Sequence, residues 1–179
     1  MSDESNRSPI SLLVITGTMG AGKSAVMAEA SDLLAMRDIV HAAIDLDALG
    51  LAHLSPPALN DEAMHGNLQS VCGNYARLGV RRFLVARAVE TPSELELLRN
   101  ASCAHNVLVC RLTASPECLR QRVRSRETGV LQDKFVARVD KLNAILDRSC
   151  LENLTIANEG RSVTEVAREL LIRAAWIRD

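Results

Sequence analysis

Residues 17–24 have the sequence GTMGAGKS and fill every fixed position of the pattern G-x-x-x-x-G-K-[ST]. They follow a short apolar run at residues 11–16 and precede residues 23–36, whose apolar positions recur at helical spacing. The glycines of the segment allow backbone angles that a side chain forbids, so successive N–H groups can point inward at an anion. The sequence therefore predicts a strand, a loop that cradles phosphate, and a helix that adds the positive end of its dipole. We call residues 17–24 the phosphate loop.

The residue types in the phosphate loop predict a nucleoside triphosphate as its ligand. Lys23 supplies a mobile cation for the β- and γ-phosphates, and the Ser24 hydroxyl can ligate Mg²⁺. A chance match in an ordinary turn is the alternative, but the strand before the loop and the helix after it are the context that the motif requires. The expected contacts with the nucleotide come from Gly17, Thr18, Met19, Gly20, Ala21, Gly22, Lys23, Ser24 and Ala25.

Strand-like and helix-like segments alternate along the chain five times. This order predicts an α/β fold, with a parallel sheet and helices on both faces. The helix expected at 61–78 contains Gly66 and Gly73, which predict an interruption or a bend. Capping boxes are expected at 91–94 and 162–165. The expected strands cover residues 11–16, 39–44, 80–86, 106–112 and 154–157, and the other expected helices lie at 23–36, from 91 onward, 115–126, 133–146 and 162–176.

The length of 179 residues favours one domain, which we expect at residues 10–179 behind a flexible tail at 1–9. A net charge of −1 and four aromatic residues argue against a nucleic-acid partner. No apolar run approaches the length of about 20 residues that spans a bilayer, so no membrane partner is expected. The five cysteines have no C-x-x-C spacing and predict reduced thiols. With a polar, acidic start and no secretory signal, the expected location is the cytoplasm.

Two carboxylates, Asp45 and Asp47, follow the second expected strand. In open parallel sheets the ligand crevice lies outside the carboxyl ends of the strands. If the extended geometry persists, strand alternation points both side chains to the same side. A carboxylate there can hold the Mg²⁺ shell or take the proton of an acceptor hydroxyl, and Asp47 is the stronger candidate for the acceptor. The alternative is a solvated pair that caps the strand end.

Four arginines at alternate positions, 120, 122, 124 and 126, lie on one expected helix. At 100° per residue, Arg120 and Arg124 share one face, while Arg122 and Arg126 share roughly the opposite one. Guanidinium groups match the oxygens of a transferring phosphoryl group. One pair is therefore expected to face the nucleotide, and the other to be solvated.

Two further candidates lie at the same edge of the sheet. Residues 158–161, including Asn158 and Arg161, follow the last expected strand and can border the purine. The Asn-Lys-x-Asp motif that recognises guanine does not occur in the sequence, which argues against a GTPase. Arg87 follows the third strand and can bind an anionic acceptor; an ion pair with Glu90 is the alternative.

From residue 11 to residue 176 the chain resembles the small P-loop kinases, the group of shikimate, gluconate, adenylylsulfate and nucleoside monophosphate kinases. The phosphate loop matches theirs, and Asp45-Leu46-Asp47 is similar to their D-x-D, in which the first acid serves Mg²⁺ and the second the acceptor. Leu119, Arg122 and Arg126 are similar to their lid helix, which favours the Arg122/Arg126 pair: the first arginine packs on adenine and the second reaches the phosphates. The resemblance implies strand order 2-3-1-4-5 and a short lid at about residues 120–135.

The chain also departs from this group. The third strand ends at Val85-Ala86-Arg87 without an acid, the Gly-Gly-Gly of shikimate kinases is absent, and so are the acceptor signatures of gluconate and adenylylsulfate kinases. The resemblance implies transfer of phosphate from ATP, with Mg²⁺, to a hydroxyl of a small molecule, through Lys23, Asp47, Arg122 and Arg126. Asp47 and Arg87 are the expected acceptor-binding residues. A nucleotide-binding regulatory protein without transfer activity and a slow ATPase are the alternatives, and the oligomeric state is left open.

Overall fold

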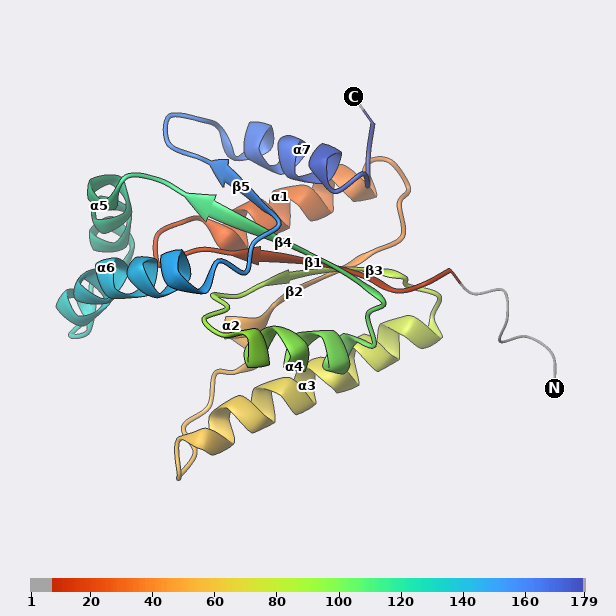
Figure 1. Cartoon of the computed structure of the whole chain (residues 1–179), viewed down its shortest axis with the longest axis horizontal. Coiled ribbons are helices and arrows are strands. Elements are labelled where there is room, and N and C mark those ends of the chain that lie inside the picture. Colours follow the sequence, from red (N-terminus) through yellow and green to blue (C-terminus); the bar gives the residue numbers. More distant parts are fainter. Residues whose placement is uncertain (1–7, 179) are drawn as a thin grey trace.

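The computed structural model describes residues 8–178 and contains a five-stranded sheet in which every neighbouring pair is parallel. The order β2-β3-β1-β4-β5 confirms the expected α/β fold and its 2-3-1-4-5 topology (Figure 1). Residues 1–7 of the predicted tail lie outside the described part. The strands are β1 (Ser11–Thr16), β2 (Ala42–Asp45), β3 (Arg82–Ala86), β4 (Asn106–Thr113) and β5 (Leu154–Ala157).

Helices cover both faces of the sheet, as expected for parallel strands joined by crossovers. In Figure 1, α1 and α7 lie on one face, α3 and α4 on the other, and α5 with α6 at the carboxyl end of the strands. The helices are α1 (Lys23–Ala35), α2 (Leu46–Leu49), α3 (Ala58–Arg77), α4 (Pro92–Ser102), α5 (Pro116–Arg126), α6 (Gln132–Ser149) and α7 (Val163–Arg173). None of the described helices is long and apolar enough to cross a bilayer.

The central strand β1 is buried on both faces because its side chains alternate between two apolar clusters. Leu13 and Ile15 belong to the cluster under α1 and α7, while Leu12 and Val14 belong to the cluster under α3 and α4. Val14 pairs in register with Val85 of β3 and Val109 of β4, so β1 is the middle of the sheet. The loop that follows β1 therefore begins at the end of a strand that is buried on both faces.

Polar side chains cap the N-termini of several helices, and one of these caps differs from the sequence prediction. Ser162 and Glu165 form the expected capping box at α7. At α4, the Thr91 hydroxyl accepts a hydrogen bond from the backbone N–H of Glu94, but the Glu94 carboxylate accepts from the N–H of Glu90 at 2.9 Å. The box expected at residues 91–94 is thus half formed, and Glu94 is turned toward the end of β3.

Strand β2 is shorter than expected and passes directly into a helical turn. It covers Ala42–Asp45, and α2 begins at Leu46. Asp45 is the N-cap of α2, and its Oδ1 accepts from the backbone N–H of Asp47 at 3.0 Å and of Ala48 at 3.4 Å. The extended geometry needed to point Asp45 and Asp47 to the same side therefore ends at Asp45, and that part of the prediction is wrong.

Helix α3 is continuous from Ala58 to Arg77, so the interruption predicted at Gly66 and Gly73 is wrong. Its buried residues Met64, Leu68 and Cys72 recur on one face and anchor the helix on the sheet, which outweighs the low helix propensity of two glycines. A Cβ atom on either glycine would have no neighbour within 4 Å, so both lie on the open side of the helix.

Candidate functional site

The phosphate loop connects β1 to α1 at the carboxyl end of the sheet, where it turns under β4 and α5. Gly17 has φ +147° and Gly20 has φ +78°, both in the region that favours glycine. A Cβ on Gly17 would lie 2.7 Å from the Leu112 carbonyl oxygen, and one on Gly20 would lie 2.6 Å from that of Leu119. The loop is therefore wound so closely against its neighbours that these positions accept no side chain.

This geometry predicts a large effect of Gly20→Ala. The new methyl group must displace backbone of α5 and adopt a strained φ, so we expect affinity for a nucleoside triphosphate to fall by at least about tenfold. Gly66→Ala is the matched control, because its methyl group meets open space in a helix; it is expected to raise the free energy of unfolding by about 0.5–1 kcal/mol. Calorimetric titration and thermal unfolding measure both, and equal nucleotide affinity in the two variants would contradict the loop geometry.

Lys23 begins α1 and folds back over the phosphate loop. Its Nζ donates to the backbone carbonyl of Thr18 at 3.2 Å. Burial lowers the pKa of Lys23; the nearby carboxylates of Asp47 and Asp45 oppose this shift, while the Arg126 and Arg87 guanidiniums add to it. The ammonium is thus held in a partly desolvated place between the loop and Asp47, where an added polyanion would favour its charged form.

The remaining residues of the phosphate loop differ in their burial and in their hydrogen bonds. The Thr18 hydroxyl donates to the Val139 carbonyl of α6 at 2.9 Å, and this contact is buried. The Thr18 side chain is thus engaged with α6, which leaves its backbone amide for a phosphate. Ser24 and Ala25 are exposed on the first turn of α1, and Met19 is half-buried against the apolar cluster under α1 and α7.

Arg122 lies against the phosphate loop together with Asn158. Its Nη1 donates to Asn158 Oδ1 at 2.9 Å and to the Gly20 carbonyl at 3.4 Å. The buried Asn158 in turn donates from Nδ2 to the Ala21 carbonyl at 2.6 Å. Beside them is a pocket of about 180 Å³, and its wall is formed by Gly20, Gly22, Ala25, Val26, Arg122, Asn158, Arg161, Val163 and Val166. Arg161 is oriented by Glu169 at 2.7 Å and by the Ala157 carbonyl at 3.1 Å.

The other arginines of α5 separate as the helix geometry predicts. Arg120 pairs with Asp140 of α6, and its Nη1 donates to both carboxylate oxygens, at 2.7 and 2.9 Å. Arg126 bonds Glu127 at 2.8 Å and is close enough to Lys23 to lower the pKa of that lysine. The face of α5 that carries Arg122 and Arg126 is therefore the one next to the phosphate loop.

Arg87, directly after β3, joins three carboxylates. Its Nη1 lies 2.7 Å from Asp47 Oδ1, its Nε lies 3.3 Å from Glu94 Oε1, and its Nη2 lies 3.8 Å from Asp61 Oδ1. Burial lowers the pKa of Arg87, but the bonds to Asp47 and Glu94 outweigh it and raise the pKa above its ordinary value. The alternative partner named from the sequence, Glu90, pairs instead with Arg138 at 2.9 Å.

These groups border a polar cavity of about 470 Å³, which we call the acceptor-side pocket. Its wall combines residues of α3, of the β3–α4 connection, of α4 and of α6: Asp61, His65, Arg87, Glu90, Thr91, Ser93, Glu94, Leu97 and Arg138. Of these residues the sequence singled out Arg87 as a candidate. The others belong to no binding or catalytic motif, and four separate segments supply them, so no local signal could have identified them as part of a site.

Comparison with known proteins identifies the fold group of this chain. No family model matches the sequence, and no curated protein matches it. Among solved structures, a shikimate kinase from Bacteroides thetaiotaomicron is 16% identical with a TM-score of 0.65, over 94% of this chain and 99% of that one. A gluconokinase from Sinorhizobium meliloti is 19% identical with a TM-score of 0.61, over 96% of this chain and 94% of that one. The chain has the fold of the small P-loop kinases.

A third protein of this fold has two compounds bound in its solved structure. The adenylylsulfate (APS) kinase CysC of Mycobacterium tuberculosis, in complex with AMPPNP and APS, is 18% identical with a TM-score of 0.61, over 93% of this chain and 98% of that one. At these identities the likeness establishes the P-loop kinase fold.

The donors near the phosphate loop fit a magnesium ion that is shared with a triphosphate. Ser24 is exposed at the loop exit, and capping of α2 uses Oδ1 of Asp45, which leaves Oδ2 for a ligand. Within residues 8–178, no group of three or more His, Cys, Asp or Glu side chains is arranged to hold a metal by itself. Mg²⁺ typically takes one or two protein ligands and completes its shell with phosphate oxygens and water, so the sparse donor set suits it.

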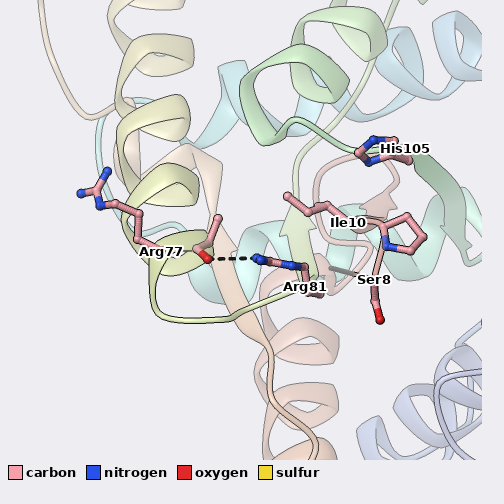
Figure 2. A pocket seen from close by; sticks show the side chains of 7 residues that line it. Ser8, Ile10, Arg77, Arg81 and His105 are labelled. Carbon is pink, nitrogen blue, oxygen red and sulfur yellow. Dashed lines mark hydrogen bonds between the residues drawn. The ribbon is translucent and has the colours of Figure 1, made fainter. Parts of the chain in front are cut away.

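A third cavity, of about 420 Å³, lies away from these groups, at the end of the sheet where the strands begin. Figure 2 shows Arg81, which donates to the Ala76 carbonyl at 2.9 Å, together with His105 and Arg77 at its wall. Ser8, Pro9 and Ile10 complete this wall with Ala76. None of the site residues predicted from the sequence lines it, so the candidate site remains at the opposite edge.

Proposed function

We propose that the protein transfers the γ-phosphoryl group of ATP to a hydroxyl group of a small molecule. The observation that carries this proposal is the position of Lys23, whose ammonium bonds the phosphate loop and is close enough to Asp47 for that carboxylate to oppose the lowering of its pKa by burial. A cation between an anion cradle and a carboxylate suits a reaction in which a phosphoryl group passes from one side to the other.

On the nucleotide side, the backbone amides of residues 17–24 and the Lys23 ammonium hold the β- and γ-phosphates. The adenine lies in the pocket of about 180 Å³, where the Arg122 guanidinium offers a flat cationic surface. Asn158 orients Arg122 through its side-chain oxygen, and Arg161 lies at the rim of the same pocket. Arg126 stands on the same face of α5 and neutralises charge on the transferring group.

On the acceptor side, Asp47 accepts the proton of the attacking hydroxyl through Oδ2, since Arg87 engages Oδ1. The acceptor oxygen forms a bond to the γ-phosphorus while the bond from that phosphorus to the β,γ-bridging oxygen breaks. The leaving group is ADP, and the proton on Asp47 returns to solvent after the products leave. Asp47 is more than half exposed, with 58% of its side-chain surface accessible, which allows both steps.

Ser24 and Asp45 would hold Mg²⁺, which when bound neutralises charge on the β- and γ-phosphate oxygens. We further propose that residues 10–179 act as one nucleotide-binding domain, with a lid at about residues 120–135. That segment spans the last turns of α5, the connection to α6 and the start of α6, and includes the fully exposed Val130.

Asp47→Asn tests the proposal, because the amide keeps the shape of the carboxylate and removes the base. We expect the rate at which ATP phosphorylates an acceptor to fall by about 10²–10⁴-fold, while the affinity for ATP stays within about twofold. Asp32→Asn, at an exposed position of α1, is the control and should change neither quantity. A protein that binds ATP and phosphorylates nothing in a broad panel of hydroxyl compounds would instead be a nucleotide-binding module without transfer activity.

A further inference from the structure

The acceptor-side pocket has a charge distribution that selects among acceptors. Three of its carboxylates, Asp61, Glu90 and Glu94, face two guanidiniums, and the adjoining Asp47 adds a fourth negative group. The four carboxylates and two guanidiniums leave a formal excess of two negative charges. Lys141 lies beyond Glu90 in a neighbouring cavity and does not line this pocket.

The two arginines are already engaged. Each of the three nitrogens of Arg87 has a carboxylate oxygen within 4 Å, and Nη2 of Arg138 lies 2.9 Å from Glu90. A carboxylate or phosphate on an acceptor would have to displace one of these protein carboxylates, and the displaced group would remain beside it. Like charges held close together disfavour binding. The arginines therefore position the pocket's own acids and leave little attraction for an incoming anion.

His65 adds a second, independent indication. Its Nδ1 lies 2.7 Å from the backbone carbonyl of Asp61, and a carbonyl oxygen can only accept, so Nδ1 carries the proton. In the neutral ring, Nε2 is then an acceptor, and it is buried with no partner within the described part of the chain. An unpaired buried acceptor at the wall of a pocket is satisfied by a ligand that donates a hydrogen bond.

We propose that the phosphoryl acceptor is a cationic amino alcohol, a hydroxyl compound that carries an ammonium group and no carboxylate or phosphate. This inference rests on the proposed function, since it describes the acceptor of that reaction. The exposed carboxylate of Asp61 and the free lone pair of His65 accept hydrogen bonds from the ammonium and hydroxyl groups. Asp47 remains available at the edge of the pocket for the hydroxyl that reacts.

Three compounds with one carbon skeleton test this charge preference: gluconate, glucitol and 1-amino-1-deoxyglucitol. A shorter series of glycerate, glycerol and 3-amino-1,2-propanediol repeats the comparison. Binding is measured by ligand-observed NMR in the presence of Mg²⁺ and a non-hydrolysable ATP analogue, so that the phosphate loop is occupied and cannot attract the acids. We expect the amine of each series to bind at least about tenfold more tightly than the acid, with the neutral polyol between them.

Asp61→Asn removes one carboxylate from the pocket and should reduce the advantage of the amine over the polyol several-fold. Glu62→Gln removes the neighbouring acid, which is exposed and does not line the pocket, and should leave that advantage unchanged. Equal or tighter binding of the acids, no binding of any compound, or equal effects of the two substitutions would overturn the inference.

Phosphorylation of the same compounds, followed by mass spectrometry, separates this inference from the proposed function. If the amines bind preferentially and no compound yields a phosphate ester, the charge preference holds and the transfer proposal fails. If a carboxylate-bearing compound is both bound best and phosphorylated, transfer holds and the charge preference fails.

Discussion

We expect Lys23→Met to lower the rate of phosphoryl transfer by about two to three orders of magnitude, because it removes the ammonium group that bonds the Thr18 carbonyl of the phosphate loop. Affinity for ATP should fall as well, since the lysine balances charge on the bound phosphates. Steady-state kinetics with an amino alcohol acceptor and calorimetric titration of ATP measure the two effects. Arg168→Met, at an exposed position of α7, removes the same charge and should change neither.

The same substitution should leave the free protein no less stable. Burial lowers the pKa of Lys23, so the unfolded chain binds a proton at this site more strongly than the folded chain does. The charged lysine therefore opposes folding below its ordinary pKa, and this cost disappears as pH rises above that value. An unfolding midpoint of Lys23→Met that lies well below that of the parent protein at neutral pH would contradict the burial of the ammonium.

We expect Arg87→Met to have the largest effect on stability, about 2 kcal/mol of the free energy of unfolding. The substitution leaves the carboxylates of Asp47, Asp61 and Glu94 near one another without their shared cation. A fully buried pair broken in this way costs about 3–5 kcal/mol, and the present group is partly exposed, with 24% of the Arg87 side chain accessible. Turnover should fall too, because Asp47 loses the bond that orients it.

Two comparisons make this prediction specific. Arg82→Met removes an exposed arginine at the start of β3, the strand that precedes Arg87, and should change stability by less than about 0.5 kcal/mol. Arg87→Lys keeps the charge but cannot reach three carboxylates at once, so an intermediate loss is expected. Equal losses of stability in Arg87→Met and Arg82→Met would contradict the role of these ion pairs.

The fold was predictable because its strongest signals are local. Apolar runs such as residues 11–16 and 154–157 match β1 and β5 without change, and the cap and acid at Ser162 and Glu165 start α7 where expected. The errors came where packing overrides a local preference. Gly66 and Gly73 weaken a helix in isolation, yet α3 continues through them because its opposite face is buried. The extended geometry that was to reach Asp47 ends at Asp45, which caps a helix, as acids with free backbone N–H groups ahead of them often do.

The two halves of the candidate site differ in the same way. The phosphate loop of the nucleotide half is one contiguous motif. Helical spacing alone placed Arg122 and Arg126 on a different face from Arg120 and Arg124. The acceptor half is assembled from side chains far apart in the chain, such as Asp61, Glu90 and Arg138, which meet because the sheet order brings α3, α4 and α6 to one edge. Patterns along the sequence contain no information on such a meeting, so even the partner of Arg87 could not be foreseen.

The buried hydrogen bond from Thr18 to the Val139 carbonyl has one more consequence. Val139 directly follows Arg138, whose guanidinium helps to form the wall of the acceptor-side pocket. The backbone of α6 is thereby bonded to the phosphate-donor half of the site and also carries part of the acceptor half. Any tilt or slide of α6 displaces both at once, which gives the two substrates a mechanical route by which the arrival of one alters the fit of the other.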